Sequence, residues 1–491
     1  MLGAVRERAG EGAGAPVPAL VDAGPTATSR SDHVLFGGLV ALVVAGTMSG
    51  LRTDVTIWGH EITIRPDQVV LLALLPAIAV ALTRRGLARS WSVLHTPVFA
   101  FLAANAVASV AASGVRDVSL QGTALMTVYV AMYTGVVVLI TDRPAWAHRL
   151  LAVVVGLGFV HALYGTAAIL LFAAGIHVGG VMFGQVGPHS VTAKSTFPEA
   201  NLLAAFMLLL AIFSAVRLVS APGGARRAAW FGGFCLAGLV LVLTVTRAAW
   251  LSLLLGLLLL GLALLIRGKS PRRVLAAMRP VLLGLVVIAV LSLVVCDPLL
   301  SRLWGEEHVL LTRVYSLSFL VDVPADCGND VAVQGGAVVG SCTSVVGRLE
   351  MFKEGFEGWR ERPLLGHGTF GGKATGRDYW MSSFIQALYD TGLLGAVALL
   401  AMYLVVMVAP WRASSRALDA GERDLFLACA IGNALLMLTS QLASFLWVGF
   451  PWIFMGSRRR RSSPCEPGTT TPPPDYLRDR ATRRQSGRRA A

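Results

Sequence analysis

Long apolar stretches alternate with short polar linkers along most of the chain. Twelve such stretches can be marked, near residues 34–50, 68–83, 95–113, 119–140, 150–175, 200–216, 229–246, 249–266, 280–296, 383–409, 424–440 and 443–456. Apolar runs of about 18 residues or more are typical of helices that span a bilayer. Backbone groups in lipid must be satisfied within their own segment, which favours helices over open strands. The pattern predicts an all-α, polytopic integral membrane protein with about 12 transmembrane helices.

One linker is much longer than the others, and it separates the ninth predicted helix from the tenth. Because the remaining linkers are short, we expect chemistry or recognition to reside in this long loop. The chain then divides into an N-terminal segment, two groups of helices, the loop, a third group of helices and a tail. These parts cover residues 1–33, 34–194, 195–296, 297–382, 383–456 and 457–491.

Basic residues are distributed unevenly between alternate linkers. The linkers on one side hold sixteen Lys and Arg, from Arg84 to Arg423, and the short linkers on the other side hold five. Because basic linkers stay in the cytoplasm, the long loop is expected to be extracytoplasmic and both termini cytoplasmic. We interpret the first apolar helix as a retained anchor and the two terminal segments as disordered.

Composition agrees with a membrane protein and changes how the net charge is interpreted. Hydrophobic residues make up 55% of the chain and charged residues 14%, with a mean hydropathy of +0.67. The net charge is +14 and the pI is near 10.1. In this setting the basic residues set topology and attract anionic membrane lipids, and we expect no nucleic acid partner.

The cysteines and acids of the long loop indicate one disulfide and no metal site. Cys327 and Cys342 both lie in the loop, where an oxidising compartment allows a disulfide; two unpaired thiols are the alternative. Asp322, Asp326 and Asp330 lack the tight alternate spacing of a calcium loop. We therefore expect neither a metal nor a cofactor.

Arg247 is the first candidate for a chemical role by its placement alone, because it interrupts a long apolar region between two predicted helices. A guanidinium is costly in hydrocarbon, so it must lie at the membrane rim or in a wet cavity, where its geometry suits phosphate oxygens. An arginine that only marks a tight helical hairpin is the alternative interpretation.

Arg348 opens an amphipathic segment of the long loop. Apolar residues recur there at helical spacing up to Trp359, and Pro363 ends the pattern. An arginine in the first turn of a helix adds to the positive end of the helix dipole, which favours an anionic ligand. A packing helix with ordinary surface charge remains the alternative.

Two further segments carry polar residues that could reach a ligand. His367 lies in a glycine-rich turn after Pro363, where glycines allow close backbone approach to a ligand, although a lone loop histidine can be incidental. Lys194 lies in the outward segment before the sixth predicted helix and is a candidate for substrate binding. Glu199 and Asn201 lie at the entrance of that helix, and they could line a sugar site or serve as helix-capping groups.

Five fragments, in this order, resemble the bacterial O-antigen ligase and O-antigen polymerase family. They are Ser195-Thr-Phe-Pro-Glu-Ala-Asn-Leu-Leu-Ala, Leu-Thr-Val-Thr-Arg247-Ala-Ala-Trp-Leu, Gly347-Arg348-Leu-Glu-Met-Phe, Arg362-Pro-Leu-Leu-Gly-His-Gly-Thr-Phe and Phe384-Ile-Gln-Ala-Leu-Tyr-Asp-Thr-Gly-Leu-Leu-Gly395. Each fragment is weak alone, but their order and the long outward loop together are specific.

The resemblance implies a metal-independent membrane glycosyltransferase. Its donor would be an undecaprenyl-pyrophosphate-linked oligosaccharide, and its acceptor a glycan, a lipid or a protein. Arg247 and Arg348 fall on the positions of two family arginines that engage the donor pyrophosphate. They would stabilise charge developing on the leaving group.

The chain departs from the family at one functional position. Ligases of the family usually carry a His-Asn pair before the glutamine-bearing helix, and Met381 and Ser382 stand there. Methionine cannot accept a proton, so another group must serve as base if one is needed. His367 is the first candidate, and Asp378 and Glu350 are carboxylate candidates.

Two other functions remain open on sequence grounds. A transporter or flippase for the same lipid-linked glycan would share the apolar helices, and a catalytically inactive scaffold would explain the missing histidine. We interpret the chain as a glycosyltransferase that transfers or polymerises the glycan at the outer face of the cytoplasmic membrane, in surface polysaccharide biosynthesis.

Overall fold

The computed structural model describes most of the helical body. The described residues are 30–48, 50–51, 53–57, 60–85, 91–112, 114–141, 144–176, 183–185, 191–197, 199–305, 307–315, 341–375, 382–417 and 419–441. Residues 1–29 of the predicted N-terminal segment 1–33, the predicted tail 457–491 and the predicted helix 443–456 lie outside them.

Eleven of the twelve predicted apolar stretches coincide with helices of the described chain. These are α1 (Arg30–Thr47), α2 (Pro66–Arg85), α4 (His95–Ala111), α5 (Arg116–Thr141), α6 (Pro144–Ala173), α7 (Ala200–Ser220), α8 (Gly224–Leu243), α9 (Arg247–Ile266), α10 (Pro271–Leu291), α14 (Ser383–Arg416) and α15 (Ala420–Thr439). Among the described residues, seven helices are long and apolar enough to cross a membrane, and three shorter apolar helices accompany them. The chain is a mostly helical, polytopic membrane protein.

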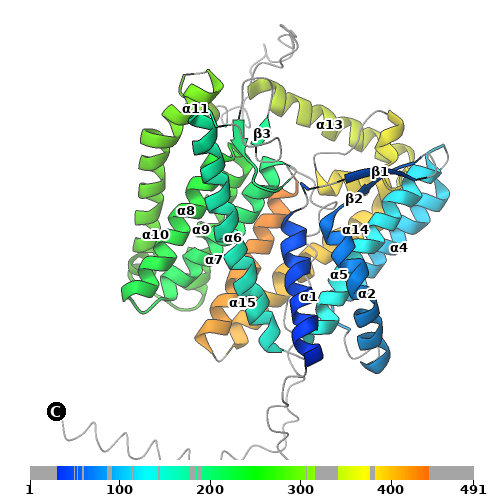
Figure 1. Ribbon diagram of the computed structural model, residues 1–491, viewed down its shortest axis with the longest axis horizontal. Helices are drawn as coiled ribbons and strands as arrows, with labels where there is room; N and C mark the ends of the chain where they lie inside the picture. The colour runs from blue at the N-terminus through cyan, green and yellow to red at the C-terminus, as the bar shows by residue number, and fades with distance from the viewer. Residues whose placement is uncertain are drawn as a thin grey trace, which may run out of the picture.

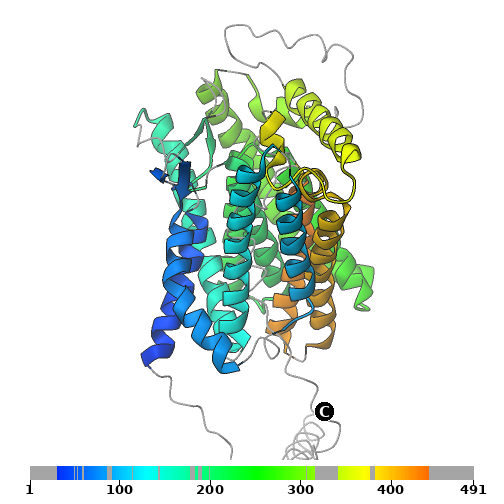
Figure 2. The ribbon, with the colours of Figure 1, turned by 90° about the vertical axis from the view of Figure 1, so that its right-hand side faces the viewer.

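The helices run alternately up and down and form a side-by-side bundle (Figure 1; Figure 2). The loop between α10 and α14 lies at one end of it. There α10 continues through a π-helical turn (Ser292–Cys296) into α11 (Asp297–Trp304), followed by α12 (Val309–Tyr315) and α13 (Ser341–Glu361). The indole Nε1 of Trp304 donates to the carbonyl of Val191 at 2.9 Å, which anchors the start of the loop to the bundle.

Two small hairpins at the same end as α13 correct the all-α prediction (Figure 1). Strand β1 (Thr53–Ile57) pairs antiparallel with β2 (His60–Ile64), and β3 (Phe183–Gln185) pairs antiparallel with β4 (Val191–Ala193). The sequence of the first hairpin alternates apolar and polar residues, which is a strand pattern. Its short runs lie between much longer helical stretches, and the sequence interpretation missed them.

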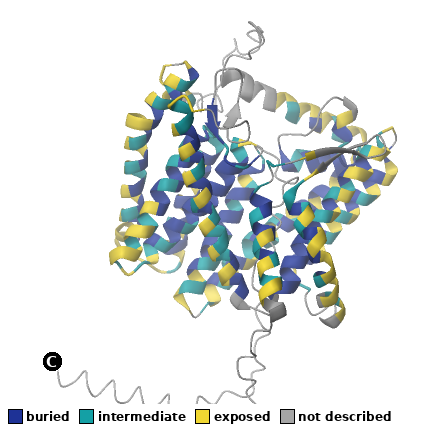
Figure 3. Ribbon diagram, in the orientation of Figure 1, coloured by how far each residue is buried: buried dark blue, intermediate teal, exposed yellow. Residues whose placement is uncertain are grey.

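The bundle contains two hydrophobic cores. One is built from α7, α8, α9, α10 and α15, and the other from α1, α2, α4, α5 and α14. Val154 and Leu157 of α6 pack against both cores. Exposed residues lie along the outer helices of the bundle (Figure 3). They include large apolar ones, since Leu258 of α9 is 67% exposed and Val397 of α14 is 56% exposed. Such a surface is costly in water and is suited to lipid.

Helix α13 confirms one part of the loop prediction and corrects another. It ends at Glu361, before Pro363, as its sequence predicts. It begins at Ser341, however, so Arg348 does not lie in the first turn. The dipole argument made for Arg348 is therefore wrong. Helix α13 lies across the end of the bundle (Figure 1), and Gly355 is buried while Leu349 and Phe356 are exposed.

Candidate functional site

The turn between β4 and α7 is held in a strained conformation. Ser195 has a φ of 53° and is fully buried. Its hydroxyl lies 3.0 Å from Nδ1 of His161 on α6, and the His161 ring packs against Phe197 and Phe206. A non-glycine residue with positive φ persists only where its surroundings fix it. The His161–Ser195 contact is one such constraint.

The same turn is also attached to α1. The hydroxyl of Thr196 donates to the carbonyl of Thr47 at 2.9 Å, and the amide of Gly50 donates to the carbonyl of Thr196 at 2.8 Å. A side chain on Gly50 would collide with the backbone of Thr196 and Phe197. These contacts fix where α7 begins, and with it the position of Asn201 in its first turn.

Asn201 is connected directly to the turn that precedes Arg247. The hydroxyl of Thr246 donates to Oδ1 of Asn201 at 3.1 Å, and Arg247 is the first residue of α9. Val245, in the same turn, has a φ of 54°. The indole of Trp250 donates to the carbonyl of Leu241 at 3.2 Å and holds the two helices of the hairpin together. The structure thus brings Asn201 and the backbone of Arg247 into one site.

Two helix N-termini meet at this site, and both raise the local positive potential. Neither Glu199, before α7, nor Thr246, before α9, caps its helix with a side-chain hydrogen bond. First-turn amides and the helix dipole favour an anion. Arg247, half-buried at the first position of α9, adds its charge to that potential. Glu199 is acidic and exposed, and its negative charge offsets part of this positive potential.

Lys194 lies on the turn that leads into α7 and is half-buried. Its carbonyl accepts the amide of Phe197 at 3.1 Å. We refer to Asn201, Thr246 and Arg247 as the α7–α9 cluster, and the contact of Lys194 with Phe197 does not join Lys194 to it. The cluster lies at the end of the bundle that carries α13 (Figure 1), because α7 and α9 both begin there. Arg247 and two helix N-termini make this part of the described chain suited to a phosphate group.

His367 belongs to a different set of contacts. Its Nε2 lies 2.8 Å from the carbonyl of Gly358 on α13, and its ring stacks on Tyr389 of α14 at 4.6 Å between centroids. Because a carbonyl oxygen can only accept, Nε2 must carry the proton. In the neutral imidazole Nδ1 is then the acceptor. None of these contacts joins His367 to the α7–α9 cluster.

The loop that carries His367 fits into a break in α14. Gly392 has a φ of 62°, and the amide of Leu393 donates to the carbonyl of Pro363 at 2.8 Å. The carbonyls of Tyr389 and Asp390, just before the break, accept hydrogen bonds from the loop. Their donors are the amides of His367, at 2.9 Å, and Gly368, at 2.8 Å, respectively. The backbone of the loop therefore completes the interrupted helix.

Buried polar side chains hold the far side of this loop. Thr369 donates to Oδ1 of Asn105 on α4 at 2.9 Å, and the hydroxyl of Ser109 lies 3.1 Å from that of Thr369. Oδ2 of Asp390 accepts the amide of Phe370 at 3.2 Å and Nε2 of Gln386 at 2.5 Å. Hydrogen bonds between buried polar groups favour a single arrangement of the segment that carries them, here the loop with His367.

Several residues that the sequence singled out belong to parts of the chain that the structure does not describe. Cys327, Asp378 and Met381 lie outside the described residues, and the side chains of Arg348 and Cys342 are likewise not described. The disulfide and the role of Arg348 stay predictions. Ser382 acts as a helix cap, since its hydroxyl accepts the amide of Ile385 at 3.2 Å and donates to Gln441 at 2.8 Å.

Sequence interpretation missed His161, Thr246, Thr369 and Asp390. Thr369 and Asp390 lie within two of the quoted fragments, and this could have drawn attention to them. His161 lies in the apolar middle of α6, and a polar residue there is a recognisable signal. Over the described residues, no group of three or more His, Cys, Asp or Glu could hold a metal ion.

The comparison with protein families supports the resemblance. Residues 232–400 match the family model described as O-Antigen ligase. This confirms the resemblance for a segment that includes Arg247, α13, His367 and the first half of α14, but not Lys194 or Asn201. The match covers α9, α10 and the loop up to the first half of α14, and it shows what this part of the chain is similar to. No curated protein matches the chain.

Proposed function

We propose that the protein is a glycosyltransferase that transfers or polymerises an undecaprenyl-pyrophosphate-linked glycan at the outer face of the cytoplasmic membrane. The observation that carries the proposal is the α7–α9 cluster, where Arg247 lies at a helix N-terminus beside the Thr246–Asn201 hydrogen bond. The general family assignment of residues 232–400 supports the same class of reaction.

In this proposal the α7–α9 cluster binds the pyrophosphate of the donor. The bonds from Thr246 to Asn201 and from Trp250 to Leu241 hold the backbone of the first turn of α9, from which the Arg247 side chain extends, before the donor arrives. Preorganised donors stabilise charge that develops on a leaving pyrophosphate without having to reorganise. Arg348 would supply a second guanidinium from α13. The lipid tail of the donor would lie among the helices, and the acceptor would enter beneath the 297–382 loop.

His367 is the proposed base for the acceptor hydroxyl. The Gly358 carbonyl fixes the proton on Nε2, which leaves Nδ1 as the basic nitrogen. Stacking on Tyr389 holds the ring in one orientation. A base of this kind must reach the hydroxyl at hydrogen-bond distance. The acceptor is therefore expected to approach the face of the loop between α13 and α14.

The size distribution of surface and carrier-linked glycan tests this function in a deletion strain. The strain is complemented with wild type, with Arg247→Ala or with the control variant Arg272→Ala. Arg272 is an exposed arginine at the opposite end of the bundle. We expect wild type and Arg272→Ala to restore the profile and Arg247→Ala to fail. Accumulated single repeat units would identify a polymerase, and long chains retained on the carrier would identify a ligase.

The same strains distinguish the alternative functions. A transporter would leave its lipid-linked glycan on the cytoplasmic side when deleted, where extracellular enzymes cannot reach it. A scaffold would show equal rescue by Arg247→Ala and wild type. Either result would overturn the proposed glycosyltransferase activity.

A further inference from the structure

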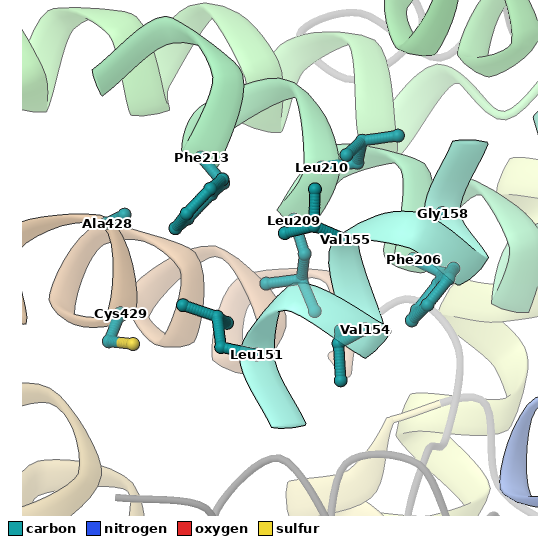
Figure 4. A pocket seen from close by; sticks show the side chains of 10 residues that line it. All are labelled: Leu151, Val154, Val155, Gly158, Phe206, Leu209, Leu210, Phe213, Ala428 and Cys429. Carbon is teal, nitrogen blue, oxygen red and sulfur yellow. The ribbon is translucent and has the colours of Figure 1, made fainter. Parts of the chain in front are cut away.

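The interior of the bundle has no room for lipid where α6, α7 and α15 meet. Figure 4 shows Leu151, Phe213 and Ala428 among the side chains that line this seam, and the cavity between them measures about 30 Å³. Such a volume holds a water molecule but no acyl chain. Lipid therefore contacts this seam only from outside the bundle.

One outer surface lies apart from the membrane-spanning helices, on α13. Leu349, Lys353, Phe356 and Arg360 recur along this helix at spacings of four, three and four residues, so they form one stripe. All four are exposed, with Leu349 at 53% and Phe356 at 38%. We refer to these four residues as the mixed stripe. Its two large apolar side chains are costly to leave in water.

A second stripe, beside the first, is entirely acidic. Its members are the exposed residues Glu350, Glu354, Glu357 and Glu361. On the opposite face of α13, Gly355 is buried, and a methyl group on Gly358 would collide with the Tyr389 ring of α14. The bundle therefore holds α13 by its glycine face and leaves both stripes exposed. The apolar and basic side chains are separated from the acidic ones.

The C-terminal end of the mixed stripe is connected to α14. The Phe356 ring lies 4.9 Å from the Trp359 ring, and Cζ of Arg360 lies 4.9 Å from the centre of the Phe356 ring. The indole Nε1 of Trp359 donates to the carbonyl of Pro363 at 3.0 Å. The same carbonyl accepts the amide of Leu393 at 2.8 Å. The last turn of α13 is thus fixed beside the break in α14.

The length of α14 after the break indicates that the break lies at the membrane boundary. The segment from Leu393 to Trp411 carries no charge, and Arg412 follows it. At 1.5 Å per residue this segment spans about 28 Å, close to the roughly 30 Å of a hydrocarbon core. Leu364, next to the break, is 62% exposed, and Leu393 and Leu394 are exposed as well. The lipid-facing surface of α14 therefore continues to the end of α13.

We propose that the mixed stripe of α13, together with Leu364, contacts the phospholipid surface of the leaflet at that end of the bundle. Leu349 and Phe356 enter the boundary between headgroups and acyl chains, as the apolar face of an interfacial helix does. Lys353 and Arg360 lie among the hydrated phosphates, with their aliphatic stems along the apolar surface. The acidic stripe faces water, because phosphates repel carboxylates. The proposal does not depend on the transferase activity.

Nitroxide labels on single cysteines test the proposal. A cysteine-free variant of the full-length protein, in nanodiscs of phosphatidylethanolamine and phosphatidylglycerol, receives either Phe356→Cys or its matched control Glu357→Cys. Both positions are exposed, so a label disturbs little packing. Oxygen concentrates in hydrocarbon, whereas a neutral nickel chelate stays in water. We expect the ratio of oxygen to nickel collision rates to be about threefold higher or more for the Phe356→Cys label.

A second matched pair tests the other end of the stripe. Labels on Leu349→Cys and Glu350→Cys should differ in the same direction. Thermal scans verify that each labelled variant folds. Equal ratios within both pairs would place both stripes in water and overturn the proposal. Low collision rates with both reagents at Phe356→Cys would also overturn it, because a second copy of the chain or another protein would then cover the stripe.

Discussion

At the scale of single residues, the decisive feature is how Arg247 is positioned. The sequence singled it out because a charge interrupts apolar sequence, and the structure explains how it is presented. The first turn of α9 is attached to α7 by the hydrogen bond from Thr246 to Asn201. Arg247 thus depends on residues that are distant from it in sequence.

Replacing Thr246 by valine tests this positioning. Valine keeps the shape of threonine but leaves Oδ1 of Asn201 without its donor. A lost hydrogen bond of about 1 kcal/mol predicts a roughly fivefold lower transfer rate. Thr246→Ser retains the hydroxyl and should remain close to wild type. If the valine and serine variants transfer glycan equally fast, the bond does not position Arg247.

Replacing His367 by glutamine separates its structural role from its role as a base. The amide nitrogen of glutamine can replace Nε2 as the donor to Gly358, but glutamine cannot accept the acceptor's proton at neutral pH. We expect the melting temperature to change little and the transfer rate to fall about 100-fold or more. Retained transfer by a folded His367→Gln protein would eliminate His367 as the base.

At the scale of elements, the sequence predicted regular helices well and irregular ones poorly. The apolar length that lipid requires defines a membrane helix almost by itself, and α7 begins at the residue expected. The break in α14 at Gly392 was not predicted, because its cause is a set of backbone bonds to residues 363–368. The early start of α13 was missed for a different reason. Residues 341–347 include β-branched residues and a glycine, which weaken a helix prediction.

Gly392→Ala tests the importance of this break. A methyl group at Gly392 would lie 2.4 Å from the carbonyl carbon of Leu364, at a positive φ. We expect a loss of roughly 2 kcal/mol or more in unfolding free energy. Gly156→Ala on α6 is the control, since nothing lies within 4 Å of its added methyl. It should be neutral or slightly stabilising. Equal thermal unfolding of the two variants in detergent would contradict the described packing of the loop.

At the scale of the whole molecule, the alternation of basic linkers predicts which end faces the cytoplasm. The structure places α13 at one end and the linker between α9 and α10 at the other (Figure 1). The assembly of the α7–α9 cluster, in contrast, could not be predicted. It joins the turn between β4 and α7 to the turn between α8 and α9. No local sequence pattern predicts a contact between these two turns.

Labelling with a membrane-impermeant maleimide tests the orientation. Single cysteines at Lys353 on α13 and at Lys269 between α9 and α10, both exposed, are introduced into a cysteine-free variant. In intact cells we expect Lys353→Cys to react and Lys269→Cys to react only after lysis. The reverse pattern would place the α7–α9 cluster on the cytoplasmic side and exclude transfer at the outer face.

Binding of undecaprenyl pyrophosphate to the purified protein tests the central claim most directly. Wild type, Arg247→Ala and Arg272→Ala are compared for affinity toward this lipid and toward undecaprenyl monophosphate. The account predicts that Arg247→Ala binds the pyrophosphate about tenfold more weakly, since one charged contact is lost, while Arg272→Ala binds like wild type. Equal affinity of Arg247→Ala and wild type for the pyrophosphate would contradict it.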